Sequence, residues 1–223
     1  MSHQAAVIHP LAPKPKQHGA FGSYVLKHYT PARQKYGFHF KSYDERVFTP
    51  VIRKEIRQAK VADQGHYTVY LPGYHDDVLM HFLRQFDVKW EVFSKHAHYA
   101  YRVDNVFIEP ISQARFQQSL ISAGGVLCGA GFELPSEALF LGKKTLVIPM
   151  KGHYEQACNA LGAVEVGAVS IPELDLLHHR FNVLSTRVVG RLVVVDDLAE
   201  QLHLALQMRK RSRAEHDAGG WPL

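Results

Sequence analysis

The feature that most constrains this chain is a regular alternation between short apolar segments and amphipathic ones, which begins at His66. The apolar segments predict strands over 66–72, 88–94, 101–110, 125–129, 144–149 and 163–167. Apolar residues recur at helical spacing over 75–86, 112–124, 135–142, 154–162 and 171–181. Short continuous strands that alternate with helices are typical of a parallel sheet covered on both faces. We therefore expect an α/β fold with a doubly wound parallel sheet.

The segments outside this alternation divide the chain into three parts. Residues 1–59 contain the breakers Pro31 and Pro50, and they predict a short helix over 21–28 and a short helix or strand over 51–59. The sheet domain is expected over 60–211 and closes with a helix over 196–211. Residues 212–223 are left as a tail. The basic run at 209–213 suits the negative end of that last helix, or an anionic partner.

Composition limits the classes of partner and the compartment. The 223 residues carry a net charge of +5, which favours anionic ligands such as phosphates or an acidic membrane surface. This charge is too small and too scattered to predict a nucleic-acid partner. No apolar run approaches the roughly 20 residues that a membrane span needs. Only two cysteines occur, Cys128 and Cys158, which argues against a disulfide scaffold and predicts the reducing cytoplasm.

The stretch CGAGFELPSE, residues 128–137, follows one predicted strand and opens the next helix. Its glycines let the backbone approach a ligand closely, and Pro135 suits the first helical position. The N–H groups of such a first turn favour a phosphate. Glu137, expected in that turn, is either a favourable charge at the helix start or an acceptor for both ribose hydroxyls. The residues predicted to surround the phosphate are Gly129, Gly131, Phe132 and Ser136.

A second polar group, in PMKGHYEQACNA, follows the very next strand. Glu155 and Gln156 stand at the predicted helix start, and Asn159 shares a helix face with Gln156. His153, just before them, is the histidine best placed to contact a ligand. Because consecutive strands bring both loops to one sheet edge, a phosphate site and a hydroxyl-binding pair together predict a nucleotide-sugar ligand. Helix capping and surface solvation are the alternative for these residues.

These residues resemble the C-terminal domain of inverting glycosyltransferases of the GT-B architecture, which has two Rossmann-like domains. The bacterial cell-wall N-acetylglucosaminyltransferases and the UDP-glycosyltransferases belong to this group. The resemblance is specific from Gly124 to Ala160 and looser over 47–210. It implies UDP-sugar as the donor, with Glu137 on the ribose and Glu155 and Gln156 on the donor sugar. It also implies that Ile111, in the stretch IEPIS, contacts the base.

The resemblance has consequences for the rest of the protein. It implies that a further N-terminal domain chooses the acceptor and carries the general base, and that residues 1–59 are the remnant of that domain and the interdomain linker. We therefore expect no catalytic base in this chain, no metal and no cofactor. The sequence leaves three kinds of partner possible: an N-terminal domain on another chain, a second copy of this chain in a homodimer, and a lipid or membrane-surface acceptor.

Three alternatives compete with the glycosyltransferase interpretation. The same architecture serves sugar-nucleotide 2-epimerases, which turn over the donor without an acceptor. The second alternative is a non-catalytic nucleotide-sugar-binding module, or half of a split enzyme, which binds the donor without turnover. A general phosphate or nicotinamide binder is disfavoured, because GAGFEL lacks the third glycine of the dinucleotide fingerprint.

Overall fold

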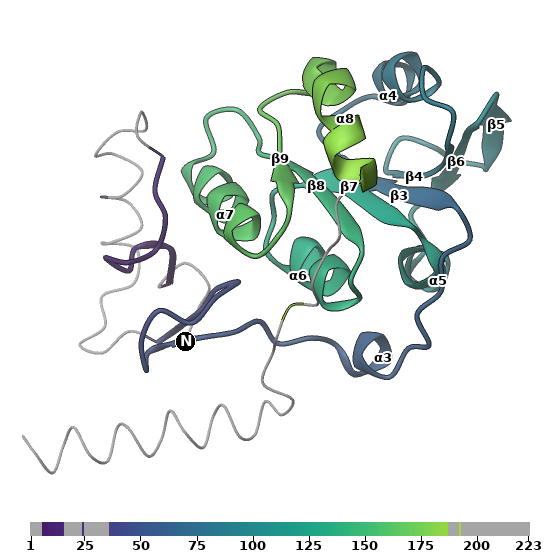
Figure 1. The fold of residues 1–223 in the computed structure, drawn as a ribbon. Helices are drawn as coiled ribbons and strands as arrows, with labels where there is room; N and C mark the ends of the chain where they lie inside the picture. The colour runs from purple at the N-terminus through teal and green to yellow at the C-terminus, as the bar shows by residue number, and fades with distance from the viewer. Residues whose placement is uncertain (1–5, 16–23, 25–35, 187–191, 193–223) are drawn as a thin grey trace, which may run out of the picture.

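A seven-stranded sheet dominates the computed structural model, which describes residues 6–15, 24, 36–186 and 192 (Figure 1). The strand order is β5-β6-β4-β3-β7-β8-β9, and every neighbouring pair is parallel except β5 with β6. The strands of this sheet are β3 (His66–Tyr70), β4 (Lys89–Ser94), β5 (Tyr101–Val103), β6 (Val106–Pro110), β7 (Gly125–Gly129), β8 (Lys144–Ile148) and β9 (Val169–Ser170). The helices are α3 (Lys54–Arg57), α4 (Asp76–Leu83), α5 (Gln113–Ser122), α6 (Glu133–Phe140), α7 (Tyr154–Glu165), the 3₁₀ turn η1 (Leu174–Leu176) and α8 (Leu177–Thr186).

Numbered along the chain, the six parallel strands follow the order 3-2-1-4-5-6, which is the order of Rossmann folds. The order reverses between β3 and β7. Helices cover both faces, with α4 and α8 on one side and α5 and α6 on the other (Figure 1). Each face has its own apolar core, one under α4 and α8 and one under α3, α5 and α6. The expected doubly wound α/β fold is therefore confirmed.

Buried polar contacts fix the junctions of this sheet. The ammonium group of Lys143 is 3% exposed and donates to the carbonyl oxygens of Ala62, Ile121 and Ala123. Two of those carbonyls stand at the C-terminal end of α5, where helix carbonyls lack partners within the helix. One side chain thus joins the end of α5, the start of β8 and the segment that leads into β3.

A smaller unit precedes the main sheet. Two short parallel strands, β1 (Gly37–Phe38) and β2 (Val47–Phe48), form a separate sheet. This unit contacts the main sheet's helices through side chains. The Tyr43 hydroxyl donates to Glu165 at the end of α7, at 3.0 Å, and the Phe40 ring packs edge-on against Phe132. Burial and the nearby Glu165 carboxylate raise the pKa of Tyr43.

Several predicted boundaries are wrong. The single strand predicted over 101–110 is the antiparallel hairpin of β5 and β6, turned at Asp104 with φ of 54°. The strand predicted over 163–167 is instead the end of α7 and its following turn, and the strand begins at Val169. The helix predicted to stop at Gly162 continues to Glu165. The physical reason is that Gly162 is a close-packed site, where an added Cβ would meet the His39 ring.

Other predictions hold or fall outside the described residues. The strands predicted over 66–72, 88–94, 125–129 and 144–149 are confirmed with small changes of boundary. The segment predicted as helix or strand over 51–59 contains the short helix α3. The predicted helix over 196–211, its basic run and the tail lie outside the described residues, as does the helix over 21–28 apart from Tyr24. Within the residues described, no helix combines the length and apolarity of a membrane span.

Candidate functional site

A cavity of about 460 Å³ opens at the carboxyl edge of the main sheet. Its walls are the loops that follow β3, β7, β8 and β9, with one side chain from α4 and one from α7. The cavity includes the point where the strand order reverses between β3 and β7, which is where open α/β sheets bind ligands. Its lining residues are Leu71, Pro72, Gly73, Tyr74, Phe82, Gly129, Ile148, Pro149, Met150, Lys151, Gln156, Pro172, Glu173, Leu174 and Asp175.

The end of β7 and the loop after it carry glycines, so the backbone at these positions has no side chain between it and a ligand. Gly129, the last residue of β7, lines the cavity, and a Cβ added at Gly131 would meet no atom within 4 Å. The chain then enters α6 with Phe132 as N-cap, whose side chain makes no capping hydrogen bond. A helix start that follows a glycine turn is a favourable position for an anion, at the positive end of the helix dipole.

Helix α6 begins two residues earlier than the sequence predicts. Pro135 is its third residue, so it does not occupy the first helical position, and Glu133 is the acidic residue of the first turn. Ser136 is 1% exposed, and its hydroxyl donates to the Phe132 carbonyl oxygen at 2.6 Å. Glu137 is therefore two residues further into the helix than expected and falls in its second turn. The polar groups at the start of the helix are therefore the backbone N–H groups that precede Pro135.

Glu137 is a buried carboxylate held by a cation from a distant segment. It is 5% exposed, and its two oxygens accept hydrogen bonds from Arg53 Nε at 2.6 Å and Nη2 at 2.7 Å. Such a bidentate pair fixes the plane of the carboxylate as well as its position. The hydrogen bonds to Glu137 raise the pKa of Arg53. Glu137 does not line the cavity described above, although its helix begins at the cavity's edge.

The loop after β8 supplies the second predicted polar group. The Oε1 atom of Gln156 accepts from the backbone N–H of Met150 at 2.9 Å, which holds the amide at the cavity wall. His153 is the N-cap of α7, and its Nδ1 accepts from the Gln156 backbone N–H at 3.4 Å. Asn159 is 1% exposed and donates to the Ala130 carbonyl oxygen at 3.3 Å, which ties α7 to the loop after β7.

Ile111 stands apart from this group. It follows β6, two strands beyond β3, and its side chain is 50% exposed. Next to it the buried Glu109 pairs with Arg115 on α5, with Nη2 at 3.0 Å from Oε1 and Nε at 3.3 Å from Oε2. The carboxyl edge thus carries an exposed apolar side chain at its β6 end and the cavity over the ends of β3, β7, β8 and β9.

Of the predicted site residues, the cavity brings together Gly129 and Gln156. The neighbouring backbone carries the other predicted positions, which are Gly131, Phe132, Ser136, Glu137, His153 and Glu155. Sequence reasoning missed Arg53, as well as the cavity residues Tyr74, Lys151 and Glu173. A lysine directly after the strand at 144–149 was the available signal for Lys151. The partner of Arg53 lies 84 residues away, and no local pattern indicates it.

Two histidines whose residue type would suit a general base, His39 and His75, have partners within the structure. His39 is fully buried, with Nδ1 at 3.3 Å from the Tyr43 hydroxyl oxygen. The His75 ring stacks on His96 with centroids 4.6 Å apart. His3 lies outside the described residues. Across the described part of the chain, no group of three or more His, Cys, Asp or Glu residues is arranged to hold a metal ion.

The strand order defines a Rossmann-like domain, with a cavity at its switch point. The family model described as glycosyl transferase family 1 matches residues 6–182. Because this match covers most of the chain, the protein belongs to that family, and the resemblance inferred from the sequence is confirmed. No curated protein matches the chain.

Solved structures of glycosyltransferases are similar over part of their length. The glycotransferase of kitacinnamycin is 17% identical with a TM-score of 0.47, over 86% of this chain and 53% of that one. MurG of Acinetobacter baumannii is 15% identical with a TM-score of 0.46, over 76% and 57%. The spinosyn forosaminyltransferase SpnP is 11% identical with a TM-score of 0.47, over 91% and 60%. The chain thus spans between about half and three fifths of these proteins.

Proposed function

We propose that this chain is the donor-binding part of a GT-B glycosyltransferase that transfers a hexose from a UDP-sugar. The observation that carries the proposal is the cavity at the switch point, because its walls include both loops that the sequence assigns to the donor. Gly129 ends the strand that leads into the first of these loops, and Gln156 follows the second. Membership of glycosyl transferase family 1 supports the reaction class. The sugar acceptor is outside the proposal.

The layout of the site supports an ordered placement of the donor along the carboxyl edge. The diphosphate is proposed to lie at the uncapped start of α6, next to Gly129 and Gly131. The base is proposed to extend toward Ile111, and the hexose toward Glu155 and Gln156. When the bond between the anomeric carbon and the phosphate oxygen breaks, negative charge grows on the diphosphate. Helix N–H groups are arranged to stabilise that charge without reorganising.

Glu137 is proposed to accept the two ribose hydroxyls. A carboxylate has about four lone-pair sites, and Arg53 uses one on each oxygen. One lone pair on each oxygen therefore remains for a diol. The bond to Arg53 keeps these acceptors in a fixed orientation, which lowers the entropy lost on binding.

The proposal places catalysis in a larger assembly. The general base that deprotonates the acceptor is proposed to lie in a second Rossmann-like domain, on the same chain or on a partner. Residues 1–59 are proposed as the remnant of that domain with its linker, and 60–211 as the donor domain. The cytoplasm is the proposed location, since Cys128 and Cys158 are both free thiols. A homodimer and a lipid acceptor remain predictions.

Calorimetric titration with UDP, 2′-deoxy-UDP, GDP and NAD tests the proposal. The wild type is expected to bind UDP in preference to the other three ligands. Glu137→Gln is expected to weaken UDP binding by about tenfold, or about 1.4 kcal/mol, and to abolish the preference over 2′-deoxy-UDP. Glu45→Gln, an exposed carboxylate between β1 and β2, is the matched control and should leave UDP affinity within about twofold.

Three kinds of result would contradict the proposal in whole or in part. Failure of the folded wild type to bind UDP, or a preference for NAD, would remove the nucleotide-sugar function. Unchanged UDP affinity in a folded Glu137→Gln protein would remove the ribose assignment alone. Interconversion of UDP-N-acetylglucosamine with its 2-epimer, in the absence of an acceptor, would replace glycosyl transfer with the epimerase alternative.

A further inference from the structure

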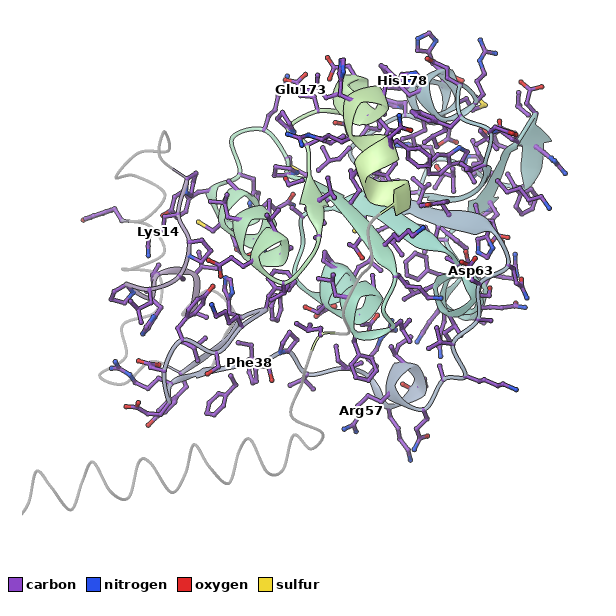
Figure 2. The ribbon with its side chains drawn as sticks, viewed as in Figure 1. Lys14, Phe38, Arg57, Asp63, Glu173 and His178 are labelled. Carbon is purple, nitrogen blue, oxygen red and sulfur yellow. The ribbon has the colours of Figure 1, made fainter. Side chains whose placement is uncertain are left out.

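One wall of the cavity carries an ion pair that joins two loops. Lys151 Nζ lies 2.8 Å from Glu173 Oε1, and both residues line the cavity. Lys151 follows β8, and Glu173 follows β9, immediately before η1. Figure 2 shows Glu173 at the top of the molecule, near His178 of α8, with Arg57 at the bottom. The pair therefore belongs to the β8 and β9 part of the cavity wall, and Tyr74 from the loop after β3 lies near it.

The spacing of the strands sets what part of a donor can reach this pair. Neighbouring strands lie about 4.8 Å apart, so β9 is roughly 10 Å from β7 along the sheet edge. With the diphosphate at the end of β7, as the proposed function has it, the base and the hexose extend in opposite directions. The hexose then lies over β8 and β9, where Gln156, Lys151 and Glu173 line the wall.

The charges of this end suit a neutral sugar better than a phosphate. The charged lining residues are one cation, Lys151, and two carboxylates, Glu173 and Asp175. A surface with a carboxylate in excess repels a diphosphate. The apolar residues Phe82, Leu174 and Met150 line the same cavity and can pack against the C–H groups of a sugar ring. The cavity therefore has a phosphate-compatible end at Gly129 and a sugar-compatible end at Glu173.

Adjacent donors and acceptors are what a pair of neighbouring sugar hydroxyls requires. A hydroxyl both donates and accepts, whereas an ammonium group only donates and a carboxylate only accepts. Lys151 can donate to one hydroxyl while Glu173 accepts from the next. Hydrogen bonds to ionised groups are roughly twice as strong as those between neutral groups. Both side chains are exposed, Lys151 by 77% and Glu173 by 45%, so a ligand in the cavity can reach them.

We propose that the Lys151–Glu173 pair recognises adjacent hydroxyl groups of the transferred hexose and thereby selects the sugar of the donor. This inference rests on the proposed function. It assigns sugar selection to the loop after β9, in addition to the polar residues that the family resemblance places at the start of α7.

The test compares each sugar nucleotide with UDP alone, because UDP lacks the hexose. UDP, UDP-glucose, UDP-galactose and UDP-N-acetylglucosamine are titrated into the wild type, Glu173→Gln and Lys151→Met. The wild type is expected to bind at least one of the sugar nucleotides more tightly than UDP. Each variant should weaken that binding by about tenfold, which is about 1.4 kcal/mol, and change UDP affinity by less than about twofold. Arg46→Met, which breaks the exposed pair with Asp44 away from the cavity, is the matched control and should change neither affinity.

The outcomes separate the inference from the proposed function. Equal loss of UDP and sugar-nucleotide affinity, or no loss of either, overturns the role of the pair while leaving the donor site intact. A wild type that binds UDP and all three sugar nucleotides with equal affinity also overturns it. A wild type that binds none of these ligands overturns the proposed function and this inference with it. Thermal unfolding of each variant verifies that a lost affinity reflects binding and not loss of the fold.

Discussion

At the scale of single residues, the pair between Arg53 and Glu137 makes the sharpest stability prediction. Arg53→Met removes both hydrogen bonds from a carboxylate that is 5% exposed. A buried charge left without its partner is costly, but Arg53 is 44% exposed, so water compensates part of the loss. We expect a fall of about 1–3 kcal/mol in the free energy of unfolding, measured by urea denaturation with unchanged m-value.

The comparison for this variant is again Arg46→Met, because Arg46 pairs with a more exposed carboxylate. The side chain of Asp44 is 21% exposed, against 6% for that of Glu137. The exposed pair should contribute less than about 1 kcal/mol. If both variants lose the same stability, burial of Glu137 does not govern the strength of its bond to Arg53. Arg53→Met should also lower the preference for UDP over 2′-deoxy-UDP, because Glu137 would lose its fixed orientation.

At the scale of elements, α7 depends on a glycine in its interior. In an exposed helix, Gly→Ala stabilises by roughly 0.5–1 kcal/mol. Here a Cβ at Gly162 would meet the ring of His39, which is fully buried. We therefore expect Gly162→Ala to destabilise the protein by about 1–3 kcal/mol, the usual cost of overpacking a core. Thermal and urea unfolding give the sign directly, and a stabilised variant would show that the unit formed by β1 and β2 can move away from α7.

The double variant Gly162→Ala with His39→Ala identifies the contact. If the clash with the imidazole is the cause, Gly162→Ala should cost less in the His39→Ala background than in the wild type. Residues in contact commonly show such coupling, by about 0.5–3 kcal/mol. Additive losses in the double variant would instead place the cost in the helix itself.

The same glycine shows how far the sequence determines the elements. Short continuous apolar runs located the strands and helical spacing located most of the helices, because a parallel sheet covered on both faces dictates those patterns. The helix end predicted at Gly162 is wrong, because the glycine is needed there for close packing against His39 and does not mark the end of the helix. The turn at Asp104 was also missed, although Asp104 and Asn105 are residues that tolerate the left-handed conformation. Both misses concern backbone positions whose reason lies in one or two neighbouring residues.

The candidate site was predictable only where its parts are local in sequence. Gly129 and Gln156 follow consecutive strands, so parallel topology alone brings them to one edge. The Lys151–Glu173 pair and the Arg53–Glu137 pair join residues 22 and 84 positions apart. No spacing rule predicts such partners, since they depend on how loops meet after the sheet has formed. The residues that set the site's charge were therefore the part that required the structure.

At the scale of the whole molecule, the sheet links the candidate ligand site to the stability of the core. Cys128 is the fourth residue of β7, at the centre of the sheet, and is fully buried. Burial raises the pKa of its thiol to about 12. At pH 8 the folded protein therefore holds almost no Cys128 thiolate, which is the form that alkylating reagents attack. Reaction at Cys128 requires the sheet to open.

That requirement makes alkylation of Cys128 a measure of global opening and of ligand binding. The loops that follow β3 and β8, the two strands beside β7, help to form the cavity. Opening the sheet therefore abolishes the proposed nucleotide site. UDP at 100 times its Kd should stabilise the folded state by about 2.7 kcal/mol and slow iodoacetamide labelling at pH 8 by about 100-fold. Mass spectrometry of the Cys128 peptide measures the rate. In Glu137→Gln at the same UDP concentration the protection should fall about tenfold, while full labelling in urea verifies that the thiol is intact. Rapid labelling without denaturant, or a rate indifferent to UDP in the wild type, would show that β7 opens independently of the proposed site.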